Sequence, residues 1–141
     1  MSEIDQLNAW LDQLDAIATD LARIDDAARS AEPGQECASS FEQVHRGALK
    51  VAGIVKERAN AQRKRPLPLN VWRAIARCGG VHQARALEVE PFVRLRQRAE
   101  ASTQHAAQIS AADVRAHVAG TLAHMDAVRA ELMGIAQPLA A

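Results

Sequence analysis

Apolar residues recur every three or four positions from residue 3 to residue 31, which predicts one long amphipathic helix over this segment. Ser2 and Asp5 have the spacing of a capping box at its start, and Glu32-Pro33-Gly34 predicts its end. Its apolar positions fall on two edges, the first Ile4, Leu7, Leu11, Leu14, Ala18 and Leu21, the second Trp10, Ile17 and Ile24. Together the edges span more than a third of the circumference at ~100° per residue, which is too wide for one neighbouring helix to cover. We therefore expect this helix to be central in a bundle or shared with another protomer.

A second helical pattern begins near Ser39, which stands three residues before Glu42 in the spacing of another capping box. It extends to about Asn60 with an apolar stripe of Phe41, Val44, Ala48, Val51, Ala52 and Val55. The pattern stops in residues 62–69, because Pro66 and Pro68 cannot continue a helix. This segment is therefore predicted to be a basic, Pro-rich loop.

Shorter helices are expected after this loop. Asn70 is a suitable N-cap for a helix over residues 70–78, and Gly79 and Gly80 predict its end. Three further helices are expected over 81–88, over 91–108 with Pro91 at its first position, and over 111–136 between the Ser110–Asp113 capping box and Pro138. One uninterrupted helix from 91 to 136 is the alternative.

These elements predict an all-α fold, a single-domain helical bundle. Residues 1–61 would form an antiparallel helical hairpin that runs from acidic to basic, and residues 62–69 the basic loop. Residues 70–137 would form a C-terminal group of short and long helices packed on the hairpin as one domain. Composition favours helices, since 30 of the 141 residues are Ala and the chain has no Tyr, two Phe and two Trp.

Several classes are excluded by what the sequence lacks. No apolar run approaches the roughly 18–20 residues that span a bilayer, so no membrane helix is expected. The acidic N-terminus has no basic and apolar regions typical of a secretory signal. Cys37 and Cys78 form neither a zinc motif nor a disulfide framework, so we expect free thiols, a cytoplasmic location and no cofactor.

The net charge of zero conceals a strong segregation of charge along the chain. Residues 1–45 hold ten Asp and Glu against two Arg, whereas residues 46–98 hold thirteen Lys and Arg against three Glu. We call residues 46–98 the basic segment. Cations at this density attract polyanions and release counterions from phosphates. The alternative is intramolecular: the acidic first helix could lie against the basic segment and neutralise it.

Residues 72–91 have the pattern of a possible helix-turn-helix, with Gly80 at the turn and Val81, Ala86 and Val89 facing inward. This arrangement would turn His82, Gln83 and Arg85 outward, where they could contact base edges. It would place five arginines for phosphate contacts: Arg73, Arg77, Arg94, Arg96 and Arg98.

The sequence thus predicts a non-catalytic nucleic-acid-binding protein, or one associated with a nucleoprotein or ribonucleoprotein complex. The candidate contact residues are Arg58, Arg63, Lys64, Arg65, Arg73, Arg77, His82, Gln83, Arg85, Arg94, Arg96 and Arg98, with Lys50 and Lys56 as weaker candidates. A homo-oligomer or a larger complex is expected through the first helix. In architecture, a small all-α chain with a basic segment resembles the small helical subunits of CRISPR effector complexes and the accessory proteins of phage and plasmid DNA packaging and partition.

Two alternatives stay open. The first is a helical protein–protein adaptor that uses its acidic first helix and its basic middle. The second is a metal-binding bundle with ligands drawn from Glu42, His45, His117 and His124. On the last helix, Asp113, His117, His124 and Glu131 fall within ~40° of one another, and we expect this stripe to be a hydrated flank of the apolar face. No nucleophile–base arrangement supports an enzyme, so no catalytic residue is assigned.

Overall fold

The computed structural model describes residues 2–134 and contains helices joined by short connections, with no strand in that range. The helices are α1 (Glu3–Arg29), α2 (Ala38–Asn60), α3 (Val71–Ala76), α4 (Gly80–Ala101), α5 (Thr103–Ala107) and α6 (Ala111–Leu132). The prediction of an all-α, single-domain bundle is confirmed. Residues 135–141 lie outside the described range, and with them the expected helix end at 136 and Pro138.

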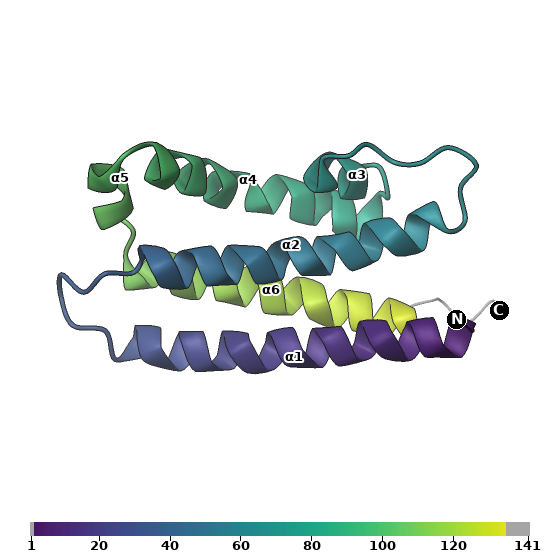
Figure 1. Cartoon of the computed structure of the whole chain (residues 1–141), viewed down its shortest axis with the longest axis horizontal. Helices are drawn as coiled ribbons and strands as arrows, with labels where there is room; N and C mark the ends of the chain where they lie inside the picture. Colours follow the sequence, from purple (N-terminus) through teal and green to yellow (C-terminus); the bar gives the residue numbers. More distant parts are fainter. Residues whose placement is uncertain (1, 135–141) are drawn as a thin grey trace.

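Four long helices run in alternating directions along the molecule. Figure 1 shows α2 and α6 in the middle of the bundle, α1 along one side of them and α4 with α3 along the other. The packing agrees, because α1 contacts α2 and α6, whereas α4 contacts α2, α3, α5 and α6. The middle layer of α2 and α6 therefore separates α1 from α4.

Both apolar edges of α1 are covered within the same chain from Leu14 onward, whereas Ile4 at the start of the helix is 70% exposed. Leu14 and Leu21 from one edge and Ile17 and Ile24 from the other are all buried between α2 and α6. Gly47 of α2 permits this close approach, because a Cβ there would lie 3.3 Å from the Ile17 side chain. The wide face of α1 is thus explained by two neighbouring helices, and an oligomer through this helix stays a prediction.

Local capping signals set most helix ends. The capping box at Ser2 and Asp5 forms as predicted, and so does the one at Ser110 and Asp113, which separates α6 from the preceding turn. The predicted capping box of Ser39 with Glu42 is wrong. The α2 helix starts one residue earlier, and the Ser39 N–H donates to Glu36 Oε1 at 2.8 Å, which leaves the Glu42 carboxylate free for another contact.

The helices predicted over 81–88 and 91–108 are a single helix, α4, with Pro91 in its interior, followed by the short α5 that Ser102 caps. Proline normally interrupts a helix because it removes a donor to the carbonyl four residues before it. Here Pro91 and Leu87 both lie on the exposed side of α4, so water can hydrogen-bond that carbonyl. On the opposite side, Val89 and Phe92 pack continuously against the core, which favours an unbroken helix.

A short helix, two glycines and a second helix do follow the loop, as the helix-turn-helix pattern predicted. Gly79 and Gly80 have φ values of 71° and 54°, a conformation that side-chain-bearing residues rarely adopt. The inward face of α4 differs from the prediction, however. Val81 is 45% exposed, whereas His82 and Arg85 are buried at 6% and 3% exposure. The outward orientation expected for these two residues is therefore wrong.

Candidate nucleic-acid interface and the polar seam beneath it

The acidic first helix forms no ion pair with a cation of the basic segment within the described residues. The carboxylates of α1 that form ion pairs reach Arg23 and Arg29 on α1 itself and Arg115 and Arg129 on α6. Because α1 and α4 lie on opposite sides of the middle layer, the acidic helix lies away from the cations of α3, α4 and the preceding loop, whereas the cations of α2 lie between them (Figure 1).

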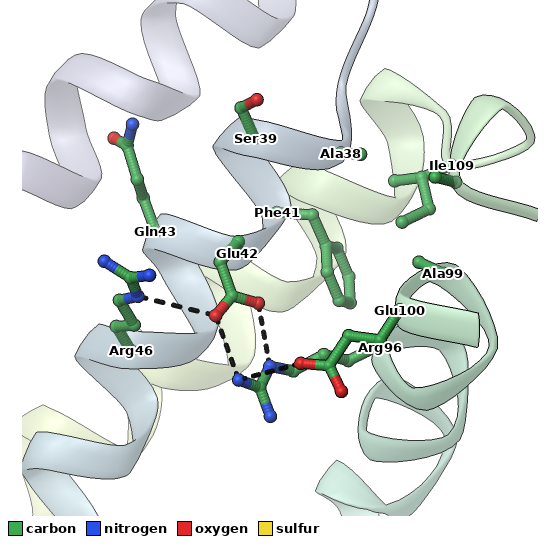
Figure 2. A pocket seen from close by; sticks show the side chains of 11 residues that line it. Ala38, Ser39, Phe41, Glu42, Gln43, Arg46, Arg96, Ala99, Glu100 and Ile109 are labelled. Atoms are coloured by element: carbon green, nitrogen blue, oxygen red, sulfur yellow. Dashed lines mark hydrogen bonds and ion pairs between the residues drawn. The ribbon is translucent and has the colours of Figure 1, made fainter. Parts of the chain in front are cut away.

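Five cations of the basic segment are paired with carboxylates from α2, α4 or α6: Arg46, Arg58, Arg85, Arg94 and Arg96. The predicted phosphate contact Arg96 makes the strongest of these pairs, donating to both oxygens of Glu42 at 2.7 and 3.0 Å. Figure 2 shows Arg46 and Arg96 reaching Glu42 from two sides, with Glu100 beyond Arg96. The hydrogen bond from Arg96 lowers the pKa of Glu42. Arg96 is therefore already occupied.

Within the described chain, eight cations of the basic segment have no carboxylate partner: Lys50, Lys56, Arg63, Lys64, Arg65, Arg73, Arg77 and Arg98. Three of them form one exposed cluster, Arg63, Lys64 and Arg65, in the loop between α2 and α3. Asn60 Oδ1 accepts from the Leu67 N–H at 2.8 Å, and the Leu67 side chain is 4% exposed. The loop is thereby anchored at Leu67 and presents this cationic cluster to solvent.

Three predicted contact residues meet at a groove between α3 and α4. The groove has a volume of about 510 Å³, and its lining includes Arg73, Gln83 and Arg94. The partly buried Trp72 and the 69% exposed Leu87 also line it. Arg94 pairs with Glu90 at 2.8 Å, an exposed pair of the kind that contributes little to stability. Trp72 was not among the predicted contact residues, and its place in the groove follows from how α3 packs on α4.

Beneath this groove, α4 packs on the middle layer through buried polar side chains as well as through apolar ones such as Val89 and Phe92. We call the buried polar set the polar seam, and it consists of His45, His82, Arg85, His117, Thr121 and His124. The spacing of its members on α6, at positions 117, 121 and 124, places them on one face of that helix. The stripe predicted as a hydrated flank of α6 is thus wrong for His117 and His124, which are 0% and 4% exposed.

The first half of the seam joins α2 to α6. His45 Nδ1 lies 3.0 Å from His117 Nε2, so one ring donates an N–H and the other accepts. The His117 ring stacks flat on Phe92 of α4, with centroids 4.4 Å apart and 6° between the planes. Burial lowers the pKa of His45 to about 4 and that of His117 to about 3, so both rings are neutral near pH 7.

The second half joins α4 to α6. His82 Nδ1 lies 3.0 Å from His124 Nε2, and His82 Nε2 lies 2.8 Å from Glu131 Oε1 and 3.0 Å from Glu131 Oε2, the oxygen that Arg58 contacts at 3.5 Å. Burial lowers the pKa of His124 to about 3. His82 and Arg58, two predicted nucleic-acid contacts, therefore bond to other side chains of the same chain.

Arg85 lies between the two histidine pairs. It donates to Glu88 Oε1 at 2.8 Å and to Thr121 Oγ1 at 3.1 Å, while Thr121 donates to the His117 carbonyl at 2.8 Å. Gly120 makes room for this arrangement, because a Cβ there would lie 2.7 Å from an Arg85 nitrogen and 2.6 Å from a Glu88 oxygen. A glycine in the middle of α6 is therefore required by a buried guanidinium from α4.

The structure brings together two residues of the metal-site alternative, His45 and His117, but does not bring all four into one ligand set. Glu42 faces Arg96, His45 pairs with His117, and His124 pairs with His82. Within residues 2–134, no three His, Cys, Asp or Glu side chains gather in a way that could hold a metal ion. Cys37 and Cys78 are both free thiols, as predicted.

Comparison with protein-family models, with curated proteins and with solved structures finds no match for this chain. None of the helices in the described range has the length and apolar character needed to cross a bilayer.

Proposed function

We propose that this chain is a non-catalytic nucleic-acid-binding protein, acting alone or within a nucleoprotein or ribonucleoprotein complex, that contacts phosphates through the cations beside α3, α4 and the preceding loop. One observation carries the proposal: the acidic helix lies on the far side of the middle layer and leaves these cations uncovered. Guanidinium and ammonium groups held without internal carboxylate partners can exchange water for phosphate at little cost.

The structure narrows the set of contact residues that the proposal uses. Its members share exposure and the lack of a carboxylate partner within the described residues: Arg63, Lys64, Arg65, Arg73, Arg77 and Arg98. Arg94 can join them by exchanging its exposed pair with Glu90 for a phosphate. Arg58, His82, Arg85 and Arg96 bond to other side chains of the chain and are therefore not proposed as contacts.

Charge reversal in the loop tests the proposal. The triple variant Arg63→Glu, Lys64→Glu, Arg65→Glu should bind oligonucleotides at least roughly tenfold more weakly at physiological salt, because three cations near the phosphates become repulsive. Its melting temperature should stay close to that of the parent, since the three side chains form no ion pair in the described chain.

A matched control changes the net charge by the same amount on the α1 side. Arg23→Glu, Arg29→Glu and Arg115→Glu replace exposed residues of α1 and α6, so this variant should keep most of the binding. An equal loss of oligonucleotide affinity in the two variants would mean that net charge alone attracts the nucleic acid. An unchanged affinity in the loop variant would refute the proposed surface.

A protein–protein adaptor is the second candidate, favoured by the acidic outer side of α1 and by two exposed leucines on the opposite side, Leu69 and Leu87, at 94% and 69% exposure. The two candidates differ in their affinity for a polyanion. Purified protein that carries no nucleic acid and is not retained on heparin would favour the adaptor.

A further inference from the structure

The groove between α3 and α4 combines an apolar floor with a cationic rim. Trp72, Ala86 and Val93 contribute apolar surface, and Arg73 and Arg94 approach from α3 and α4 respectively. Two amides, Gln83 and Gln97, also line the groove and are exposed. Amide groups can donate and accept hydrogen bonds at the same time, as the edge of a nucleobase requires.

The size of the groove restricts what can enter it. A volume of about 510 Å³ accommodates a ligand of small-molecule size. A duplex presents its bases stacked and paired within a rod, so it cannot place a base face against Trp72. A single strand can, because its bases are free to leave the stack and lie on aromatic side chains while its phosphates remain near cations.

We infer that this groove is a binding site for an unstacked base of a single-stranded nucleic acid, which lies against Trp72 while Arg73 and Arg94 contact the adjoining phosphates. The inference rests on the proposed function and specifies its ligand as single-stranded. The cationic loop at residues 63–65 attracts the backbone, and the groove selects strands whose bases are accessible. Glu90, the one carboxylate of the groove lining, is already held by Arg94.

The two tryptophans provide a built-in reporter and its control, because Trp72 lines the groove and Trp10 lies on α1 across the middle layer. Trp10→Phe leaves Trp72 as the only fluorophore, and this change costs no hydrogen bond, since Trp10 Nε1 is buried without a partner in the described chain. Trp72→Phe leaves Trp10 as the only fluorophore.

Titration with a short oligothymidylate should quench the fluorescence of the Trp10→Phe variant and leave that of the Trp72→Phe variant unchanged. A duplex of equal length should bind more weakly and cause no quenching of Trp72. Binding of the single strand without quenching of Trp72, or equal quenching by the duplex, would overturn the inference.

A second pair of variants tests the groove without altering its tryptophan. Leu87→Glu places a negative charge at an exposed position of the groove and should weaken oligothymidylate binding roughly 5- to 150-fold, the range that loss of one stacked base produces. Ala84→Glu is the matched control, because Ala84 is exposed on the same helix and does not line the groove.

The outcomes separate this inference from the proposed function. Binding that responds to the loop variant but not to Leu87→Glu would overturn the groove site and leave the phosphate-binding function in place. The absence of any oligonucleotide binding would overturn both. Quenching of Trp72 by an acidic helical peptide, with none by oligothymidylate, would assign the groove to a protein partner instead.

Discussion

The middle layer of α2 and α6 has two faces of opposite chemistry. On one face, α1 contributes leucine and isoleucine side chains, among them Leu14 and Leu21, to an apolar interior, with ion pairs to Arg115 and Arg129 of α6 at its edge. On the other, α4 packs largely through the polar seam, with Arg85 inside the bundle at 3% exposure. Apolar burial is non-directional and independent of pH, whereas buried polar groups stabilise a fold only when every donor has an acceptor.

The comparison shows which of the two interfaces has a stability that depends on solution conditions. The α1 side maintains the bundle under any conditions that preserve apolar burial. The α4 side, which carries the groove and most of the uncovered cations, depends on the protonation and geometry of a few side chains. The surface proposed to bind nucleic acid therefore lies over the interface whose stability depends more strongly on protonation and side-chain geometry.

Acidification should produce the largest effect, and should act through the polar seam. The folded-state pKa values of His45, His117 and His124 lie at about 4, 3 and 3, below the ordinary value of 6.5 in the unfolded chain. The unfolded chain therefore binds more protons below pH 6.5, and stability is retained above that pH and lost as the pH falls. Each histidine can lower the free energy of unfolding by up to about 1.4 kcal/mol per pH unit between 6.5 and its folded pKa, measurable from urea midpoints against pH.

Two histidine variants test whether the buried histidines cause the loss of stability at low pH. The double variant His45→Leu, His117→Leu replaces one buried pair by apolar side chains and should make the pH dependence shallower. His105→Gln, on the exposed surface of α5, should leave it unchanged. A urea midpoint that stays constant down to about pH 5 would contradict the lowered pKa values of His45, His117 and His124.

Leu14→Ala should cause the next largest loss, because it opens a cavity in the apolar interface. Leu14 is 0% exposed, and removal of such a side chain costs about 2–5 kcal/mol of unfolding free energy. Leu87→Ala, at an exposed position on α4, should change it by less than about 0.5 kcal/mol. Chemical denaturation measures both, and a small effect of Leu14→Ala would show that α1 is not anchored as described.

Two glycine-to-alanine substitutions should change the stability of the protein in opposite directions. Gly120→Ala places a Cβ against Arg85 and Glu88, and overpacking of this kind costs about 1–3 kcal/mol, more than the gain in helix propensity. Gly53→Ala in α2 meets no atom within 4 Å and should stabilise by about 0.5–1 kcal/mol. Thermal unfolding of the two variants compares them directly, and stabilisation by both would mean that Arg85 does not occupy its place beside Gly120.

Arg85→Met should have a small effect on the free energy of unfolding, below about 1.5 kcal/mol in either direction. Replacement of a buried ion by an apolar side chain of similar volume is often neutral or stabilising, and Glu88 is exposed enough to be hydrated once its partner is gone. Thr121 keeps its hydrogen bond to the His117 carbonyl. A loss above about 3 kcal/mol in urea denaturation would show that Arg85 itself stabilises the seam.

Local signals in the sequence predicted much of the fold. The capping boxes at Ser2 and Ser110 and the stripe of α1 depend on neighbours within one helix, so periodicity and spacing are sufficient to find them. The prediction that a helix starts at Pro91 was wrong. A helix tolerates an internal proline when the proline lies on its exposed side, and packing decides which side of α4 is exposed.

The candidate site was only partly accessible from the sequence. The cations of the loop and of α3 were found because charge is visible in composition and spacing. His82 and Arg85 were assigned to the wrong side because hydrophobic periodicity counts histidine and arginine as outward. Their partners, His124 and Thr121, are 42 and 36 residues further along the chain. The one available signal was the stripe of His117 and His124 on the last helix.

The salt dependence of single-stranded oligonucleotide binding tests the central claim most directly, because it counts phosphate contacts without any mutation. We predict that the logarithm of the binding constant falls linearly with the logarithm of salt concentration, with a slope of about 0.7 per contacted phosphate, and that the slope decreases in the Arg63→Glu, Lys64→Glu, Arg65→Glu variant. A binding constant that does not change with salt, or a slope that this variant leaves unaltered, would contradict the account.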